Sequence, residues 1–420
     1  MPFVGGARTF AENVGSRLAK DGHHVTVLTT NARRASDFWL PSTSDNQLLP
    51  SQEILDGVVV QRLQLTYPWP APYLFGLLRR AGLWMQLSRL PSILVRPVQQ
   101  RLSRWMPPLR GLPTALGRWG PEVDLIHADD SSWDGLFLAA ASAARRHGKP
   151  LVVRPLMHLG SAWVRAHYQM AHQVPVYREA AVVLALSKRE AEGYAALGVS
   201  PERIHSLRMG VGPVIPVPPE TLNTATFRRQ HSIAGPFVAF LGANTYDKGA
   251  FTLAEAVTQL NLEGMPLDLV CAGPQAEGLE AFLQRQPSKV QAVIRERVHV
   301  LGIVDETTKH RLLAACSLFA LPSQVDTFGI VLLEAWLHGK PVIGANAGGI
   351  PDLVQHEKTG LLVPFGDAGA LAAAIRRLLV EPGLAARVGS AGRQLLQLYT
   401  WDQTYQTLLE AYRTALTGKS

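Results

Sequence analysis

Short apolar runs alternate with amphipathic helical patterns along most of the chain. The runs are rich in Val, Ile and Leu, which is typical of strands buried in a parallel sheet. They lie at 24–30, 58–65, 123–127, 151–154 and 181–186 in the first half, and at 237–242, 268–273, 298–301, 317–321, 341–344 and 360–363 in the second half. Helical patterns between them, such as 8–21, 135–147 and 367–379, predict crossover helices. The alternation predicts an α/β protein with two doubly wound, Rossmann-like domains.

A Pro-rich stretch at 214–223 separates the two series and reads as a linker. We therefore expect an N-terminal domain at 1–212, a C-terminal domain at 213–398 and a final helical segment at 399–420. Ligands bind at the carboxyl ends of strands in open parallel sheets, so two such domains predict a cleft between them. The chain begins at a Gly-rich turn without the strand that normally precedes it, and we expect the true start to lie upstream.

Composition narrows the class of protein. Of 420 residues, 47% are apolar, which indicates globular domains with sizeable cores. No apolar run approaches the ~18 residues of a membrane-spanning helix, and no signal peptide is expected, so the prediction is a cytoplasmic protein. The two cysteines, Cys271 and Cys316, stand in apolar runs and predict buried thiols in a reducing compartment. No His or Cys spacing resembles a metal site, and we expect neither metal nor cofactor.

The net charge of +8 is concentrated in one segment, 57–121, which has nine arginines and neither Asp nor Glu. Removing those nine charges from +8 leaves −1 for the rest of the chain. Four tryptophans interleave with the arginines and with apolar residues, a composition that suits docking on an anionic membrane surface. The alternative is an ordinary helix pair with solvated arginines. No known nucleic-acid-binding motif is present, so nucleic acid is not expected as a partner.

The strongest chemical signal lies at 319–342, where Asp326 and Glu334 follow an apolar strand. The pattern predicts a helix that begins at Thr327 and runs to about His338. Asp326 would then lie at the carboxyl end of the strand, with Glu334 about two turns along the helix. Helix N-terminal amides favour an anion, and carboxylates accept hydrogen bonds from hydroxyls, so this geometry suits a phosphorylated sugar.

Other candidates stand at further junctions between strands and helices. Gly5-Gly6 can bring backbone amides close to a phosphate, although most such turns are only turns. Lys248 follows a strand and can meet a pyrophosphate as a point charge, or be a solvated lysine. His158 comes just after the 151–154 strand and is the histidine we expect to contact a sugar or the acceptor, the alternative being a local structural role.

These motifs in this order resemble the retaining glycosyltransferases of family 4, which have the GT-B fold of two Rossmann-like domains facing each other across a cleft. The resemblance covers nearly the whole chain. It is carried by 3–30, 184–190, 198–210, 248–249, 272–274, 301–302, 322–341, 348–349, 360–363 and the terminal run 399–401, whose helix crosses back to the N-terminal domain in that fold.

The resemblance implies transfer of a sugar, with retention of configuration and without a metal, from a nucleotide-diphosphate-sugar to a lipid-linked, polysaccharide or other glycan acceptor. It implies that Lys248 pairs with the diphosphate, that Glu334 binds the ribose and that the acceptor lies on the N-terminal domain. Asp326 would hold the donor sugar together with the backbone of Thr327, Phe328 and Gly329. Gly302 would edge the base, and Gly6 would lie near the diphosphate across the cleft.

The chain departs from the family pattern at two positions near the donor. Asp326 stands where the family usually has Glu, and Ala243 stands where it usually has an Arg beside the diphosphate. A non-catalytic GT-B partner or scaffold subunit is therefore an alternative. A GT-B nucleotide-sugar epimerase is a second alternative. It would need carboxylates and a His in the cleft as acid and base, and the sequence shows no matching set. The sequence predicts a cytoplasmic glycosyltransferase that attaches peripherally to the inner face of a membrane.

Overall fold

The computed structural model divides into two compact units. The described residues are 6–32, 50–66, 71–88, 90–103, 109–132, 134–212, 222–274 and 276–418. Unit 1 consists of the chain up to Met157, the stretch Ala162–Leu207 and the residues from Trp401 onward, whereas unit 2 consists of His158–Ser161 and Arg208–Thr400. The sequence predicts divisions after 212 and 398, a few residues from these limits. His158, expected in the N-terminal domain, is grouped with unit 2.

A parallel sheet forms the centre of unit 2. Within the described residues it has six strands in the order β10-β9-β8-β11-β12-β13. The strands are β8 (Phe237–Leu241), β9 (Asp268–Ala272), β10 (Val298–Gly302), β11 (Leu318–Leu321), β12 (Val342–Ala345) and β13 (Leu361–Val363). All residues of β8, β9, β11 and β12 are buried, as their continuous apolar runs require. The predicted α/β architecture of this half is confirmed.

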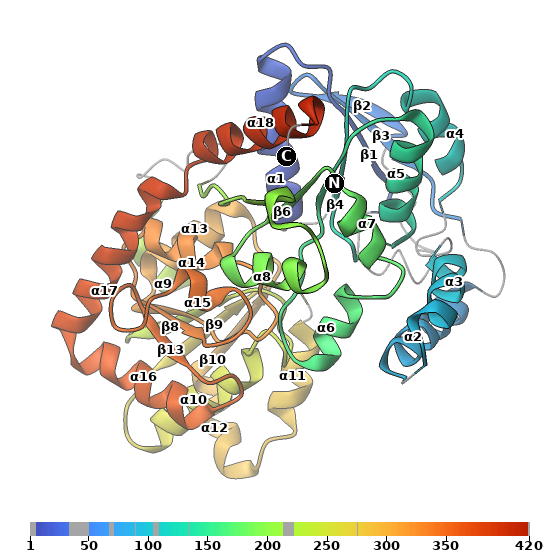
Figure 1. Ribbon diagram of the computed structural model, residues 1–420. Coiled ribbons are helices and arrows are strands. Elements are labelled where there is room, and N and C mark those ends of the chain that lie inside the picture. Colours follow the sequence, from blue (N-terminus) through green and yellow to red (C-terminus); the bar gives the residue numbers. More distant parts are fainter. Residues whose placement is uncertain are drawn as a thin grey trace. The chain divides into compact units, whose positions relative to one another are not determined.

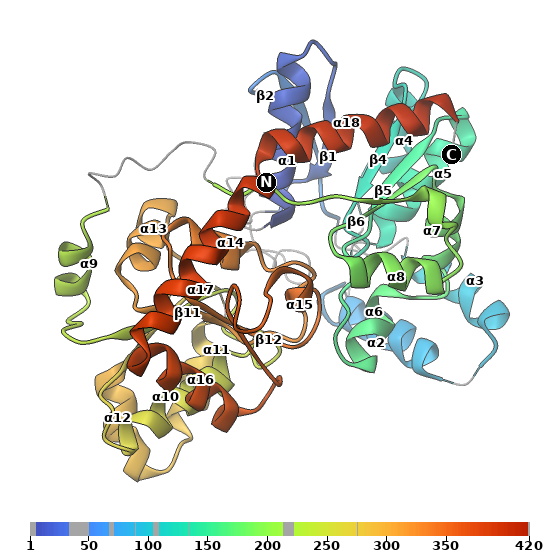
Figure 2. The ribbon, with the colours of Figure 1, turned by 60° about the vertical axis from the view of Figure 1, so that its left-hand side comes forward.

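Helices connect these strands and cover both faces of the sheet (Figure 1). They are α9 (Thr224–Gln230), α10 (Ala250–Leu262), α11 (Ala276–Gln284), α12 (Ser288–Arg297), α13 (Glu306–Ala315), α14 (Ile330–Leu337), α15 (Ile350–Leu353), α16 (Ala368–Val380) and α17 (Pro382–Leu395), followed by the 3₁₀ turn Leu396–Leu398. α10 packs against α12 and α16 on one face, and α13 packs against α14 on the other (Figure 2). Parallel strands need such crossovers, because a short turn cannot return the chain to the same end of the sheet.

Unit 1 contains two sheets among its described residues. In the first, β1 (Thr26–Thr30) pairs in parallel with β3 (Val58–Leu63), and β2 (Gln52–Leu55) pairs antiparallel with β3. In the second, four parallel strands have the order β4-β5-β6-β7. They are β4 (Ile126–Asp129), β5 (Leu151–Arg154), β6 (Val182–Ala185) and β7 (Ile204–Ser206). β1 and β4 are edge strands of their sheets.

The helices of unit 1 join its two sheets into one body. They are α1 (Gly6–Lys20), α2 (Ala71–Leu87), α3 (Ser92–Ser103), α4 (Leu112–Trp119), α5 (Asp134–His147), α6 (Ala162–Tyr168), α7 (Val174–Glu179), α8 (Lys188–Ala196) and α18 (Trp401–Thr417), with the 3₁₀ turn Pro201–Arg203. α1 packs on β3, and its Phe10 ring also meets the His127 ring of β4. α18 is held by hydrogen bonds from the Tyr405 hydroxyl to Asp21, 2.6 Å, and between the Tyr412 hydroxyl and His127, 2.7 Å. The terminal helix therefore packs on unit 1.

Two sequence expectations need correction. The helix predicted from Thr327 begins at Ile330, because Gly329 adopts a left-handed conformation, φ 82°, and caps it. The strand β2 was not predicted, although Asp56 and Gly57, both with positive φ, form the tight turn that joins it to β3. Both cysteines are buried, as predicted. None of the described helices is long and apolar enough to cross a bilayer.

Candidate functional site

Three loops converge at the carboxyl ends of neighbouring strands in unit 2. They are 242–249 after β8, 322–329 after β11 and 346–349 after β12. Backbone hydrogen bonds join them: the Gln324 amide donates to the Asp247 carbonyl at 3.0 Å, and the Gly349 amide donates to the Asp326 carbonyl at 2.8 Å. The topology thus brings segments about eighty residues apart into one site, at the end of the sheet where parallel folds bind ligands.

Glycines permit this close approach. A Cβ on Gly249, which has φ +83°, would lie 2.2 Å from the carbonyl oxygen of Pro322. A Cβ on Gly349 would lie 1.8 Å from the carbonyl oxygen of Thr327. Real Cβ atoms do not approach a backbone oxygen this closely, so the loops can meet only where these side chains are absent.

We expect Gly349→Ala to lower the free energy of unfolding by about 1–3 kcal/mol. The added methyl must displace the Thr327 carbonyl and, with it, the loop that carries Asp326. The matched control is Gly383→Ala in α17, where nothing lies within 4 Å of the added Cβ. Thermal unfolding of both variants checks the prediction, and equal midpoints for the two would contradict it.

The centre of the site is a partly buried ion pair between Lys248 and Asp326. Lys248 Nζ lies 3.1 Å from Asp326 Oδ2, and the two side chains are 24% and 20% exposed. Burial opposes ionisation of Asp326, but the Lys248 ammonium and hydrogen bonds from Ser323 and Lys248 hold its pKa below the usual range. Asp326 is therefore a carboxylate at neutral pH.

His158 lies beside this pair. Its Nδ1 forms a short hydrogen bond with the carbonyl oxygen of Val325, the residue before Asp326. The pKa of His158 is lowered, mainly by burial and also by the Lys248 charge. The hydrogen bond to Val325 and the neighbouring carboxylates oppose this shift. The imidazole is therefore neutral at pH 7. The structure thus brings together Lys248, Asp326 and His158, three of the candidate residues that the sequence singles out.

Glu334 stands on α14 and is already paired. Its Oε1 lies 2.6 Å from Lys309 Nζ, and Lys309 also lies 2.7 Å from Glu306 Oε2. Burial raises the pKa of Glu334, and the Lys309 charge limits the rise. Sequence reasoning missed Lys309, which is 25 residues from Glu334 and carries no motif; only the packing of α13 on α14 brings them together.

The remaining predicted residues occupy different positions. Thr327 and Phe328 lie in the loop before α14, where the buried Phe328 ring meets the Tyr399 ring at 5.8 Å. Gly302 ends β10 with φ 66°, and its carbonyl accepts the Gly273 amide at 2.7 Å. Gly6 begins α1 in unit 1 and is exposed, and Gly5 lies outside the described residues.

Two polar side chains in the 242–249 loop escaped sequence reasoning. Asn244 is fully buried, and its Nδ2 donates to the carbonyl oxygens of Gly273 and Pro274 at 3.0 and 3.1 Å. Within the part of the chain that the structure describes, Asn244 Oδ1 and Thr245 Oγ1 are buried without a hydrogen-bond partner. Buried polar atoms normally have a hydrogen-bond partner, so these two oxygen atoms are available to bond a ligand.

Unit 1 has a charged cluster at the carboxyl ends of β4 and β5. Arg154 is buried and makes a two-point contact with the carboxylate of Asp129, 2.7 Å at each nitrogen, while its guanidinium lies 3.6 Å from the centre of the Phe10 ring. Asp130, which follows Asp129 in the chain, has φ 62°, and burial raises the pKa of its carboxyl. Ligands of parallel sheets bind at the carboxyl ends of the strands, so this cluster is a second candidate site, in unit 1.

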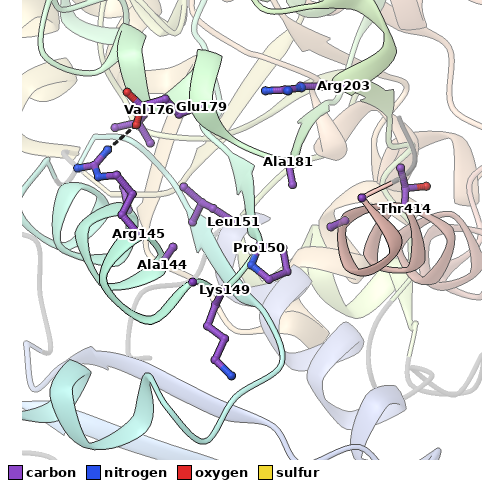
Figure 3. A pocket seen from close by; sticks show the side chains of 14 residues that line it. Ala144, Arg145, Lys149, Pro150, Leu151, Val176, Glu179, Ala181, Arg203 and Thr414 are labelled. Atoms are coloured by element: carbon purple, nitrogen blue, oxygen red, sulfur yellow. Dashed lines mark hydrogen bonds and ion pairs between the residues drawn. The ribbon is translucent and has the colours of Figure 1, made fainter.

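A pocket of about 360 Å³ opens elsewhere in unit 1, at the amino end of β5 (Figure 3). Arg145 reaches across its wall to Glu179 at 2.5 Å, and Lys149, Arg203 and Thr414 also line it. Ligands of parallel sheets bind at the opposite, carboxyl end, so the pocket is not part of the site assembled above.

Two family models match successive parts of the chain. The model described as "Glycosyl transferase 4-like domain" matches residues 5–210, and the model described as "Glycosyl transferases group 1" matches residues 223–395. The first match covers most of unit 1, and the second contains Lys248, Asp326 and Glu334. The two matches together leave only short segments of the chain unmatched.

Curated relatives of the chain include a synthase of a sugar phosphate and a mannosyltransferase. The chain is 27% identical over 339 residues to alpha-maltose-1-phosphate synthase of Mycolicibacterium smegmatis, covering 73% of this chain and 85% of that protein. It is 31% identical over 208 residues to the GDP-mannose-dependent alpha-(1-6)-phosphatidylinositol monomannoside mannosyltransferase of Mycobacterium tuberculosis. That match covers 46% of this chain and 52% of the relative, so the chain spans about half the length of this second protein.

A solved structure shares the whole fold. Anabaena Alr3699/HepE, crystallised in complex with UDP and glucose, superposes with a TM-score of 0.70 over 99% of this chain and 97% of that one, at 20% identity. At this level of identity the likeness establishes the fold alone. It is the GT-B fold expected from the sequence.

Proposed function

We infer the reaction from the premise that this chain belongs to the glycosyl transferases group 1 family. It is a glycosyltransferase, and we propose that it moves a sugar from a nucleotide-diphosphate-sugar to a glycan or lipid-linked acceptor with retention of anomeric configuration. The observation that carries the proposal is the partly buried Lys248–Asp326 pair beside His158, at the carboxyl ends of β8 and β11.

In the proposed step, the bond between the anomeric carbon and the diphosphate oxygen breaks, and the acceptor hydroxyl oxygen bonds to that carbon on the same face. The hydroxyl proton passes to the departing phosphate oxygen. Negative charge therefore builds on the diphosphate in the transition state, where a fixed cation is most effective. Lys248 supplies this cation and the amino end of α14 adds positive potential, so we propose that no metal is required.

Asp326 and His158 would hold the donor sugar. As a carboxylate, Asp326 accepts hydrogen bonds from sugar hydroxyls, and donor binding would draw Lys248 from it toward the phosphate. The Nδ1 of neutral His158 donates to the Val325 carbonyl, which makes Nε2 a hydrogen-bond acceptor for a hydroxyl of the sugar or the acceptor. The pairing of Lys248 with Asp326 keeps both charges satisfied while no donor is bound.

Glu334 would accept the ribose hydroxyls, with Lys309 as its positioning residue. The 2.6 Å contact holds the carboxylate in one rotamer and favours its ionised form, which is the form that accepts two hydrogen bonds. Ribose binding and catalytic chemistry are thus assigned to different residues on either side of Gly329.

We expect Glu334→Gln to raise the KM for the donor about tenfold with a smaller effect on kcat, because it weakens hydrogen bonds made equally in the ground and transition states. The matched control is Glu280→Gln at an exposed position of α11. Initial rates over a range of donor concentrations check the prediction. An unchanged KM with a reduced kcat would instead place Glu334 at the reacting centre.

The proposed function is tested by incubating the purified protein with UDP-sugars and GDP-sugars and measuring nucleotide release, with and without EDTA. Release of nucleotide diphosphate, undiminished by EDTA, is expected, and NMR of the product should show the anomeric configuration of the donor. Absence of both binding and release for all donors would overturn the proposal.

One observation favours a non-catalytic role as the second candidate. Ala243, in the loop that carries Lys248, stands where the resembling enzymes have an arginine beside the diphosphate, so one cation is missing from the leaving group. A protein that binds nucleotide-sugars without releasing nucleotide would fit this second role.

A further inference from the structure

The hairpin formed by α2 and α3 in unit 1 exposes an unusual density of large apolar side chains. Of the sixteen large hydrophobic residues exposed in the described part of the chain, seven lie between positions 77 and 98. These seven residues form the hairpin face: Leu77, Trp84, Leu87, Leu90, Ile93, Leu94 and Val98. Single exposed hydrophobic residues are ordinary, but a contiguous group marks an interaction surface.

The spacing of these residues follows the helices. On α2, Leu77, Trp84 and Leu87 recur at intervals of seven and three, which places them on one side. On α3, Leu94 and Val98 are four residues apart, with Ile93 beside them. Trp84 is 72% exposed and Ile93 is 77% exposed, so neither side chain is covered by a neighbouring element.

The opposite side of the hairpin is anchored, and largely by polar groups. Gln99 is only 1% exposed, and its Nε2 donates to the Gly82 carbonyl at 3.0 Å, which ties α3 to α2. Its Oε1 lies 3.1 Å from Nδ1 of the buried His172. Gln86 donates to the Gln169 carbonyl at 3.1 Å and accepts the Ala171 amide at 3.0 Å. The hairpin is thus fixed to unit 1 in this orientation.

This arrangement departs from the pattern of an ordinary surface helix pair. Such a pair buries its apolar stripe and turns polar residues to water. Here Gln86 and Gln99 bond inward and Leu83 and Val95 are buried, Leu83 in a small apolar cluster, while the seven residues of the hairpin face are exposed. Because the polar side is already satisfied, turning the hairpin over would leave buried amides without partners.

Charge identifies what the hairpin face fits. Arg80, Arg96 and Arg101 are exposed on the same two helices, and no Asp or Glu occurs from 57 to 121. A protein partner of mixed charge would meet no carboxylate over this whole segment. An anionic bilayer meets both requirements, because its acyl region takes Leu, Ile and Trp and its headgroups take arginine.

We propose that the α2–α3 hairpin docks this protein on an anionic membrane surface through the hairpin face. The inference deepens the proposed function by committing its acceptor to a lipid-linked glycan presented at that surface. Membrane binding and sugar transfer can nevertheless be measured separately.

The test is flotation of the purified full-length protein with phosphatidylcholine vesicles, with and without phosphatidylglycerol. Wild type should float only with the anionic vesicles, and less in high salt, because salt screens the arginines. The variant Trp84→Gln/Ile93→Gln/Leu94→Gln should lower vesicle partitioning about tenfold or more, and Arg80→Gln/Arg96→Gln/Arg101→Gln should act in the same direction. The control is Leu262→Gln/Val380→Gln, at unit 2 positions that are 58% and 60% exposed.

Three outcomes would overturn the proposal. Wild type could fail to float with anionic vesicles, or the hairpin variant could float as well as wild type with an unchanged unfolding midpoint. Alternatively, wild type could be a dimer that the hairpin variant converts to a monomer, which would make the hairpin face an interface between two copies.

Vesicle binding without nucleotide release would leave this inference standing while the proposed transfer failed. Transfer to a soluble acceptor without vesicle binding would do the reverse.

Discussion

Lys248→Met is expected to lower kcat for sugar transfer by about 10²–10³-fold, with a smaller change in donor affinity. The methionine keeps much of the length of the side chain but removes the ammonium group with which Lys248, in the loop after β8, pairs with Asp326. Because Ala243 supplies no second cation in that loop, we expect the loss to be near the upper end of the range. Single-turnover rates with saturating donor check the prediction, since they separate chemistry from binding.

Lys248→Arg and Lys358→Met provide the controls. The arginine keeps the charge and should retain part of the activity, although its planar fork is a poor substitute for a compact ammonium. Lys358 is exposed in the turn that precedes β13, and its replacement should leave kcat unchanged. If Lys248→Met turned over at the wild-type rate, charge on the leaving diphosphate would have to be stabilised elsewhere, and the proposed chemistry would be wrong.

The same substitution predicts a change in pH dependence. In the wild type, the pKa of Asp326 lies below its ordinary 3.8 and that of His158 below its ordinary 6.5, so the acid limb of the activity profile should lie at a lower pH than an ordinary imidazole would give. Lys248 lowers the pKa of both groups, and its loss raises both. The residual activity of Lys248→Met should therefore fall at a higher pH than that of the wild type. A pH profile of kcat for both proteins measures this shift, and coincident acid limbs would contradict it.

How well the sequence predicts the structure depends on how local the signal is. The predicted bounds of the strand at 151–154 coincide with those of β5. The apolar run there is continuous and is bounded by Lys-Pro on one side and a proline on the other, so both ends are defined. β7, at Ile204–Ser206, is three residues long and half-buried, too short for a period to emerge. The antiparallel β2 has only one local signal, the Asp56-Gly57 turn that joins it to β3.

The candidate site divides in the same way. Lys248 and Asp326 could be named from their positions after strands, because parallel topology brings the ends of neighbouring strands together. The Lys309–Glu334 contact could not be predicted, since it depends on how two helices pack side by side. The start of α14 was misplaced because a left-handed glycine, Gly329, can end a loop as readily as it ends a helix. The contact of His158 with the Val325 carbonyl required the fold itself.

Asp326→Asn is expected to lower kcat about 10- to 100-fold, because an amide donates where the sugar hydroxyls need an acceptor. It also leaves Lys248 without its carboxylate partner while no donor is bound. That second effect should tighten binding of the nucleotide diphosphate product, since its phosphates no longer compete with Asp326 for the ammonium. Product inhibition measured alongside turnover therefore separates the two roles of the carboxylate.

Asp326→Glu asks whether the site has adapted to the shorter acid. The resembling enzymes usually carry Glu at this position, and the extra methylene would extend the carboxylate toward the donor. The Asp326 side chain is only 20% exposed, and the Gly349 amide holds the Asp326 carbonyl in place, so a longer side chain has little room except toward Lys248. We therefore expect Asp326→Glu to reduce turnover, less than Asp326→Asn does, because charge is kept and only the fit is lost. A rise in turnover above the wild type would show instead that the pocket still accommodates the longer Glu side chain. The Asp at this position would then limit the turnover of the wild-type protein.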